Sequence, residues 1–351
     1  MSEAEVITQI EGGVGRLTLN RPGALHALTT SICRVMTDAL VAWRADPTVV
    51  AILIDHTGER GFCAGGDIRM LAQSGAGDAA EAREFFFIEY RLNALLFDYP
   101  KPVVAVMDGV TMGGGVGLSM PARFRVATEK TTFAMPETGI GLFPDVGGGW
   151  FLPRLKDHAG LWLALTGARI KAADCLALEI ATHVVATTRV AELKAALIAD
   201  PFHIPEALAP FMVDPGPAPV ASRLADIERL FTAPSVEAVV ANLEADGSDW
   251  AKAQLATLQT KSPQTMKVAY RQLAEGARLT RFADNMTMEY RIGARVVQKH
   301  DFLEGVRAAI VDKDNAPRWN PATLEGVTEA EIDAIFAPLP ADQEWSPLPQ
   351  T

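Results

Sequence analysis

The stretch KPVVAVMDGVTMGGGVGLSM (101–120) contains the unit that decides the fold. Its VVAVM run is apolar and of strand length, Gly113–Gly115 predict a turn, and VGLSM predicts a short helix. The same order of strand, glycine-bearing loop and helix occurs upstream, where VVAILID (49–55) precedes GFCAGGD (61–67). This alternation predicts an α/β core over residues 1–200.

Flanking segments extend the core. VITQI and VGRLTL surround the pair Gly12–Gly13, which predicts a β-hairpin over residues 6–19. A helical pattern follows over 30–43, and FRVAT and TTFAM predict two further strands between residues 124 and 135.

The composition changes after residue 200. Six prolines between Pro201 and Pro219 exclude a long regular element, so residues 201–221 are predicted to be a linker. Residues 222–336 are predicted to be a helical C-terminal region, because helix starts are marked by Ser235, Ser262-Pro263 and the capping box of Thr328 and Glu331. The proline-rich end, 337–351, is predicted to be an extended or disordered tail.

Charge and composition exclude several classes of partner. With 32 Lys and Arg against 43 Asp and Glu, the net charge is -11, which disfavours nucleic acid. We expect no membrane association, because apolar runs are too short for a span, and a cytoplasmic location, because the first residues lack a targeting pattern. The three cysteines lack C-x-x-C spacing, which predicts reduced thiols and no metal site.

Two glycine-rich turns are candidates for binding an oxyanion. The motifs typical of nucleotide hydrolysis, zinc proteolysis and nicotinamide binding are absent from the sequence. Glycine lets the backbone approach a ligand closely, so Gly65–Gly66 and Gly113–Gly115, each before a predicted helix, could aim N–H groups at one oxygen. Each turn taken alone could equally be a tight turn without a ligand.

The segment MPETGIGLFPDVGGG (135–149) places two carboxylates eight residues apart. Apolar neighbours should partly desolvate Glu137 and Asp145 and raise their pKa values towards the range of a general base. The alternatives are a surface acid after a proline for Glu137 and a turn residue for Asp145.

Together these blocks resemble the crotonase (enoyl-CoA hydratase/isomerase) superfamily, and more closely its 3-hydroxyisobutyryl-CoA hydrolase branch. The resemblance rests on collinear blocks that cover most of the chain: FCAGGDIRML (62–71), KPVVAVMDGVTMGGGVGLSM (101–120), FRVATEKTTFAMPETGIGLFPDVGGGWFLPRL (124–155), LALTGARIKAADCLALEIATHVV (163–185), TMEYRIGARVV (287–297) and DFLEGVRAAIVDKDNAPRW (301–319). It implies a spiral of ββα repeats, helices that mediate trimer or hexamer formation, and coenzyme A along the Gly65-Gly66-Asp67 turn.

The resemblance also implies roles for individual positions. The oxyanion N–H groups fall on Gly66 and Gly114, and the superfamily carboxylate falls on Glu137. Hydratases have a second catalytic glutamate three residues after the middle glycine of GGG, where this chain has Gly117. The hydrolase branch instead has an acid that falls on Asp145.

Further substrate contacts follow from the same resemblance. A glutamate of the hydrolase branch falls on Glu89, although an acid on a solvated helix face is the alternative. The phosphates of coenzyme A are expected to contact Arg21, Arg69 and Lys313, the last across a subunit boundary; solvated surface cations are the alternative. No cofactor is expected, since coenzyme A is part of the substrate.

The sequence therefore predicts hydrolysis of a short β-hydroxyacyl-CoA, with 3-hydroxyisobutyryl-CoA of valine degradation as the best candidate. Glu137 would attack the carbonyl or activate water, and Asp145 would hold the β-hydroxyl or handle the thiolate's proton; the residues leave both pairs of roles open. Three rival functions remain: an enoyl-CoA hydratase or isomerase, a serine peptidase using Ser119, and an RNA-binding protein. Gly117 argues against the hydratase or isomerase. The lack of a supporting histidine motif argues against the peptidase, and the negative net charge argues against RNA binding.

Overall fold

The computed structural model describes residues 4–349. Within that range the strands form a six-stranded sheet in the order β1-β2-β3-β5-β7-β9 and a three-stranded sheet in the order β4-β6-β8. The larger sheet consists of β1 (Val6–Glu11), β2 (Val14–Leu19), β3 (Ala51–His56), β5 (Val103–Met107), β7 (Phe124–Thr128) and β9 (His183–Val185). The smaller consists of β4 (Gly61–Cys63), β6 (Val110–Met112) and β8 (Thr132–Ala134). Only the β1–β2 hairpin is antiparallel among these described pairs.

The chain alternates between the two sheets. β3 is followed by β4 and then by α2 (Ile68–Gly75) and α3 (Ala80–Phe97), and β5 is followed by β6 and α4 (Gly114–Ser119). β7 and β8 repeat the pattern before the 3₁₀ turn η2 (Glu137–Ile140). The predicted α/β core of ββα repeats is confirmed.

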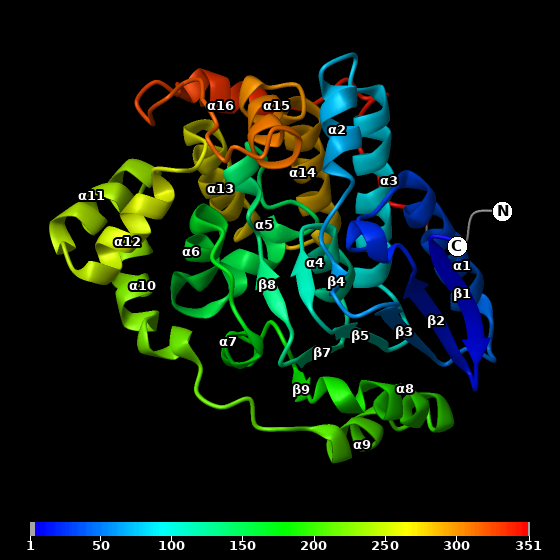
Figure 1. Cartoon of the computed structure of the whole chain (residues 1–351). Helices are drawn as coiled ribbons and strands as arrows, with labels where there is room; N and C mark the ends of the chain where they lie inside the picture. Colours follow the sequence, from blue (N-terminus) through cyan, green and yellow to red (C-terminus); the bar gives the residue numbers. More distant parts are fainter. Residues whose placement is uncertain (1–3, 350–351) are drawn as a thin grey trace.

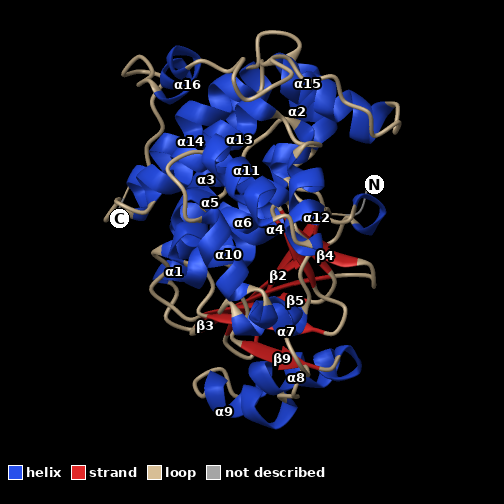
Figure 2. Ribbon diagram, turned by 90° about the vertical axis from the view of Figure 1, so that its left-hand side faces the viewer, coloured by secondary structure: helices blue, strands red, loops and turns tan. Residues whose placement is uncertain are grey.

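Helices cover both faces of the larger sheet, and its inner strand β5 (VVAVM) is apolar along its whole length. All five residues of β5 are buried, as expected for a parallel strand packed on both sides. One face packs on α8 (Val190–Ala199) and α9 (Ile204–Leu208), which lie below the strands in Figures 1 and 2. The proline-rich segment 201–221 thus contributes a short helix and buried side chains to this layer, among them Leu208 and Phe211.

The remaining helical elements follow their sequence signals. Side chains of Ser235, Ser262 and Thr328 accept hydrogen bonds from the first turns of α11 (Val236–Asp246), α13 (Pro263–Gly276) and α16 (Glu329–Phe336), and Thr328 with Glu331 forms the predicted capping box. The other α-helices are α1 (Thr30–Ala45), α5 (Gly148–Phe151), α6 (Ala159–Thr166), α7 (Ala172–Ala177), α10 (Leu224–Phe231), α12 (Asp249–Leu258), α14 (Phe282–Val296) and α15 (His300–Val306). Short 3₁₀ or π turns occupy Pro22–Ala24, Leu152–Arg154, Lys156–His158, Thr187–Arg189, Ala209–Phe211, Pro219–Ser222 and Arg307–Val311.

The C-terminal helices fold back onto the core of the same chain. Figure 1 shows α13, α14 and α15 above the sheets, with α14 packed against α3 and α15 against α2. The approach is close, because a Cβ added to Gly75 at the end of α2 would lie only 2.1 Å from the carbonyl oxygen of Val297. The C-terminal region therefore packs directly over the elements that carry the glycine turns.

Residues 337–349 of the predicted tail run as coil with one turn and pack on α3 and α14. The indole of Trp345 is buried and donates a hydrogen bond to the carbonyl of Phe87 at 3.1 Å. Glu344 pairs with Arg291 of α14. Residues 350–351 lie outside the described range.

The composition also led us to expect reduced cysteines and no membrane-spanning helix. Cys33, Cys63 and Cys175 are buried and free, as predicted for reduced thiols. Between residues 4 and 349, we find no helix with the length and apolarity that crossing a membrane requires.

Candidate active site

The two glycine turns and the acidic segment meet at one cavity of about 230 Å³. Its walls come from the turn before α2, the α3 helix, the turn before α4, and the segment that begins with η2. Six of the predicted site residues line it, namely Gly65, Gly66, Glu89, Gly114, Glu137 and Asp145. Ile68, Leu71, Phe85, Phe86, Ile140 and Leu142 give the same cavity an apolar wall.

Glycine is required in both turns. Gly65 and Gly113 have φ angles of 117° and 47°, in the region that favours glycine. A Cβ on Gly66 would lie 2.9 Å from the Phe85 ring, and one on Gly114 would lie 2.7 Å from Oε1 of Glu89. The turns pack backbone to backbone, since a Cβ on Gly113 would be 3.1 Å from the Cα of Gly65.

Gly114 opens α4, and the first N–H groups of a helix have no partner within it. Gly66 directly precedes Asp67, the N-cap of α2. Both glycines line the cavity, which is the placement an oxyanion hole requires. Their role as donors to a substrate oxygen stays a prediction.

Three buried carboxylates face this small space. Glu137 and Asp145 are each 5% exposed, and Glu89 is 1% exposed. Burial and the charge of Asp145 raise the pKa of Glu137 well above its usual value. Burial raises the pKa of Asp145 to about 7, against the opposing effect of a 2.9 Å hydrogen bond from the Tyr90 hydroxyl.

Glu89 belongs to this cluster and not to a solvated helix face. Burial, with the charges of Asp145 and Glu289, raises the pKa of Glu89 well above its usual value. Among the described residues, Oε1 of Glu89 and Oε2 of Glu137 have no hydrogen-bond partner. Buried polar atoms without a partner are uncommon and point to a ligand in the cavity.

Gly117 packs against Asn93 and Val146, where a side chain has no room. A Cβ there would meet Nδ2 of Asn93 and Cβ of Val146, each at 2.7 Å. Asn93 is fully buried, and neither of its amide atoms has a partner among the described residues. A glutamate at position 117 would therefore require Asn93 and Val146 to move.

We expect Gly117→Ala to lower the free energy of unfolding by about 1–3 kcal/mol, because overpacking forces neighbours out of position. Chemical denaturation monitored by circular dichroism measures it. Gly23→Ala is the matched control, since a Cβ at Gly23 meets nothing within 4 Å. Equal stability of the two variants would contradict the packing described for Gly117.

The predicted cations lie outside the cavity lining. Arg21 forms ion pairs with Asp67 at 3.0 Å and with Glu5 at 3.2 Å. Asp67 also caps α2, so the contacts of its side chain hold the start of this helix in place. Arg69 donates to the carbonyl of Ile310 at 3.3 Å, which joins α2 to the segment that carries Lys313 within one chain. Lys313 is exposed. The expected contacts of these three cations with the phosphates of coenzyme A stay predictions.

Three residues at the site have no role in the predictions made from the sequence. Tyr90 follows Glu89 and binds Asp145, Glu289 belongs to TMEYRIG, and the exposed Arg169 of LTGARI lines the cavity. The blocks quoted above contain Arg169 and Glu289 but not Tyr90, and only helix packing brings Tyr90 and Glu289 to the loop that carries Asp145. The peptidase reading loses its nucleophile, because the buried Ser119 hydroxyl donates to the carbonyl of Gly115 at 2.8 Å.

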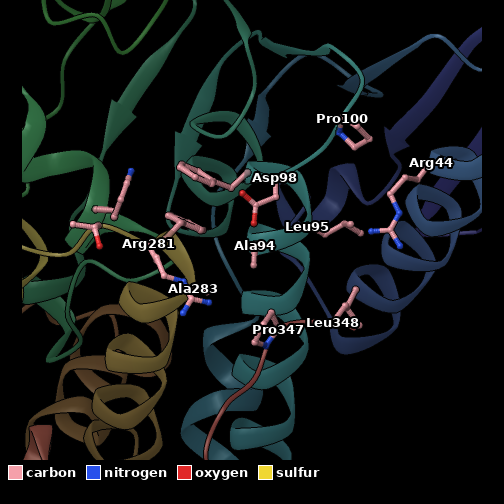
Figure 3. Close-up of a pocket in the computed structure, with 13 residues that line it drawn as sticks. Arg44, Ala94, Leu95, Asp98, Pro100, Arg281, Ala283, Pro347 and Leu348 are labelled. Atoms are coloured by element: carbon pink, nitrogen blue, oxygen red, sulfur yellow. The ribbon is translucent and has the colours of Figure 1, made fainter. Parts of the chain in front are cut away.

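A second cavity, of about 520 Å³, lies between α1, α3, the start of α14 and the tail (Figure 3). Figure 3 shows Arg44, Asp98 and Arg281 around it, with Pro347 and Leu348 of the tail at one end. Asp98 is the only carboxylate among the described residues that line it, and glycine is absent from that lining. It therefore lacks the paired acids and glycine turns of the candidate site.

Comparisons with known proteins give the same family. A family model described as enoyl-CoA hydratase/isomerase matches residues 14–336. The mitochondrial 3-hydroxyisobutyryl-CoA hydrolase of Gallus gallus is 46% identical over 354 residues, which cover 96% of this chain and 90% of that protein. The Homo sapiens protein of the same name is 43% identical, with 95% and 89% covered.

Solved structures share the fold over nearly the whole chain. One titled as a carnitinyl-CoA dehydratase from Mycobacterium thermoresistibile has a TM-score of 0.93 and 41% identity, and covers 98% of this chain and 99% of its own. An enoyl-CoA hydratase from Rhodobacter sphaeroides 2.4.1 has a TM-score of 0.90 and 37% identity, with 98% and 100% covered. Because the family model matches nearly the full length of a chain that folds as a spiral of ββα repeats, the chain belongs to the enoyl-CoA hydratase/isomerase family, the crotonases.

Proposed function

We propose that this chain hydrolyses the thioester of a short β-hydroxyacyl-CoA, with 3-hydroxyisobutyryl-CoA as the best candidate. The observation that carries the proposal is that Glu137 and Asp145 line one cavity, while the packing at Gly117 leaves no room for the second glutamate of hydratases. Relatives named 3-hydroxyisobutyryl-CoA hydrolase, at 43–46% identity over most of the chain, support it.

The thioester carbonyl would lie between the N–H groups of Gly66 and Gly114. On one route, Glu137 removes a proton from water as the water oxygen attacks the carbonyl carbon. On the other, Glu137 itself attacks and forms an anhydride that water then cleaves. In both, the C–S bond breaks and the coenzyme A thiolate takes up a proton. The raised pKa of Glu137 makes its ionised form a stronger base than a solvated carboxylate.

Asp145 would act on the other end of the acyl group. Its Oδ2 accepts a hydrogen bond from the Tyr90 hydroxyl, which leaves Oδ1 to bind the β-hydroxyl of the substrate or to pass a proton to the leaving thiolate. A buried acid held in one orientation discriminates strongly for a substrate hydroxyl, since an analogue without it leaves the acid unpaired. This favours β-hydroxyacyl over plain acyl thioesters.

A panel of acyl-CoA thioesters tests the proposal. We expect free thiol to appear fastest with 3-hydroxyisobutyryl-CoA, and about a hundredfold more slowly with isobutyryl-CoA, which lacks the hydroxyl. Crotonyl-CoA, monitored by loss of its enoyl absorbance, should react little. Rapid loss of enoyl absorbance without thiol release would overturn the proposal.

The second candidate is hydration or dehydration of a short acyl-CoA. The two solved structures cited above, named as a dehydratase and a hydratase, favour it. Against it stands the chemistry of adding water across a double bond, which needs a group for the water and a group for the α-carbon proton. In this chain Asp145 would have to be the second of these two groups, although hydratases have their second glutamate at the position of Gly117.

Several finer points belong to the same proposal. Release of 3-hydroxyisobutyrate would assign the chain to valine degradation. We expect the reaction to need no cofactor, since coenzyme A is part of the substrate. A trimer or hexamer is the predicted assembly, measurable by light scattering. A cytoplasmic location is predicted from the sequence, whereas the relatives cited above are named as mitochondrial; cell fractionation distinguishes the two.

A further inference from the structure

Glu289 holds the loop that carries Asp145. It lies on α14, fully buried, and is 142 residues from that loop in the sequence. Its Oε2 accepts the N–H of Gly147 at 2.8 Å, and its Oε1 accepts the N–H of Gly149 at 2.9 Å. One carboxylate therefore binds two backbone donors just after Asp145.

Two amides complete this contact. Nδ2 of Asn285 donates to Oε1 of Glu289 at 2.8 Å, and Nε2 of Gln272 donates to the same oxygen at 3.1 Å. Gln272 also donates to the carbonyl of Pro144 at 2.7 Å, on the other side of Asp145. All four partners of the carboxylate are donors, which an ionised carboxylate can satisfy and a glutamine cannot.

The loop needs such a clamp, because Val146 has a φ angle of 53°. A β-branched residue rarely adopts this left-handed conformation, and it persists only where the surroundings enforce it. Val146 lies between the donors bound by Glu289 and the carbonyl bound by Gln272. Tyr90 fixes the adjacent carboxylate of Asp145 from α3.

We propose that Glu289 is a positioning residue, whose carboxylate holds the strained loop at Val146 so that Asp145 faces the cavity against Tyr90. The proposal rests on the proposed function only for the catalytic use of Asp145. The clamp itself is a statement about the loop and is measurable without any substrate. It also gives the C-terminal helical region a direct role at the site.

The test begins with Glu289→Gln, which keeps the shape of the side chain. Its amide turns one of the two loop hydrogen bonds into a contact between two donors. Hydrogen exchange read by mass spectrometry should show the loop 144–149 exchanging about tenfold faster. Asp284→Asn, an exposed acid on the same helix, is the matched control and should leave exchange there unchanged. Unaltered exchange of the loop in the Gln variant would overturn the clamp.

Kinetics then separate positioning from a general structural role. We expect Glu289→Gln to lower kcat about thirtyfold, but to have little further effect in an Asp145→Asn background, because a residue that acts through another gives non-additive losses. Equal losses in both backgrounds would show a structural role and refute the proposal. Single-turnover assays with excess enzyme keep the slow variants measurable.

Relief of the strain supplies a rescue. Glycine adopts φ of 53° without cost, so Val146→Gly added to Glu289→Gln should recover kcat about fivefold over the single variant. If kcat of the double variant did not recover, the clamp would not act by maintaining the strained conformation of Val146. A loop that exchanges faster in an enzyme without thioesterase activity would refute the proposed function alone, and the clamp would stand.

Discussion

Replacing Glu137 with glutamine is expected to lower kcat for thioester hydrolysis by about a thousandfold, the scale of losing a catalytic base or nucleophile. The amide can neither remove a proton from water nor form an anhydride with the acyl group. The Km should change little, because glutamine keeps the shape of a side chain that is buried and lacks a partner at Oε2. Release of free thiol from 3-hydroxyisobutyryl-CoA measures both constants.

Glu192→Gln provides the control for this variant. That acid is exposed on α8, on the far side of the larger sheet, and pairs with Arg189. It should leave hydrolysis at the level of the wild type. Turnover of Glu137→Gln within about tenfold of wild type, with an unchanged circular dichroism spectrum, would remove Glu137 from the mechanism.

Asp145→Asn is expected to lower kcat about a hundredfold and, at the same time, to stabilise the protein at alkaline pH. Burial raises the pKa of Asp145 to about 7 in the folded chain, from about 3.9 in an unfolded one. The folded state then binds more protons between these two values. Stability from this group is complete below pH 4 and is lost as the pH rises through 7.

Asparagine carries no charge at any of these pH values, so the variant avoids the cost of burying an ionised acid. We expect its Tm to exceed that of wild type by about 5 °C at pH 8, with a smaller gain at pH 5. Asp226→Asn, a partly exposed acid on α10, should show no such pH dependence. A Tm difference that stays the same at pH 5 and pH 8 would contradict the raised pKa.

The sequence predicts the core and the two glycine turns that line the cavity well, because their signals are local. The apolar runs of β3 and β5 and the glycines of both turns specify strands, close approach and φ angles from neighbouring residues alone. The capping signals at Ser262 and Thr328 are local too. Each of these elements forms where its pattern predicts it.

The rest of the site depends on contacts that are distant in the sequence. Tyr90 is 55 residues from Asp145, and Glu289 is 142 residues from Gly147. Helix-start signals predict the helical C-terminal third, but not which buried side chain of α14 meets which loop. Asn93 is similar, since only packing places its amide against Gly117.

The helices that fold back over the sheets have a consequence for synthesis. A nascent chain that ends before Gln272 already contains both glycine turns, Glu137 and Asp145, yet lacks the groups that hold the Val146 loop. Domains form from the N-terminus as the ribosome proceeds, so the spiral can fold before the groups of the proposed clamp have been made. Because the proposed clamp needs both Gln272 and Glu289, we expect catalytic activity only after residue 289 has been translated.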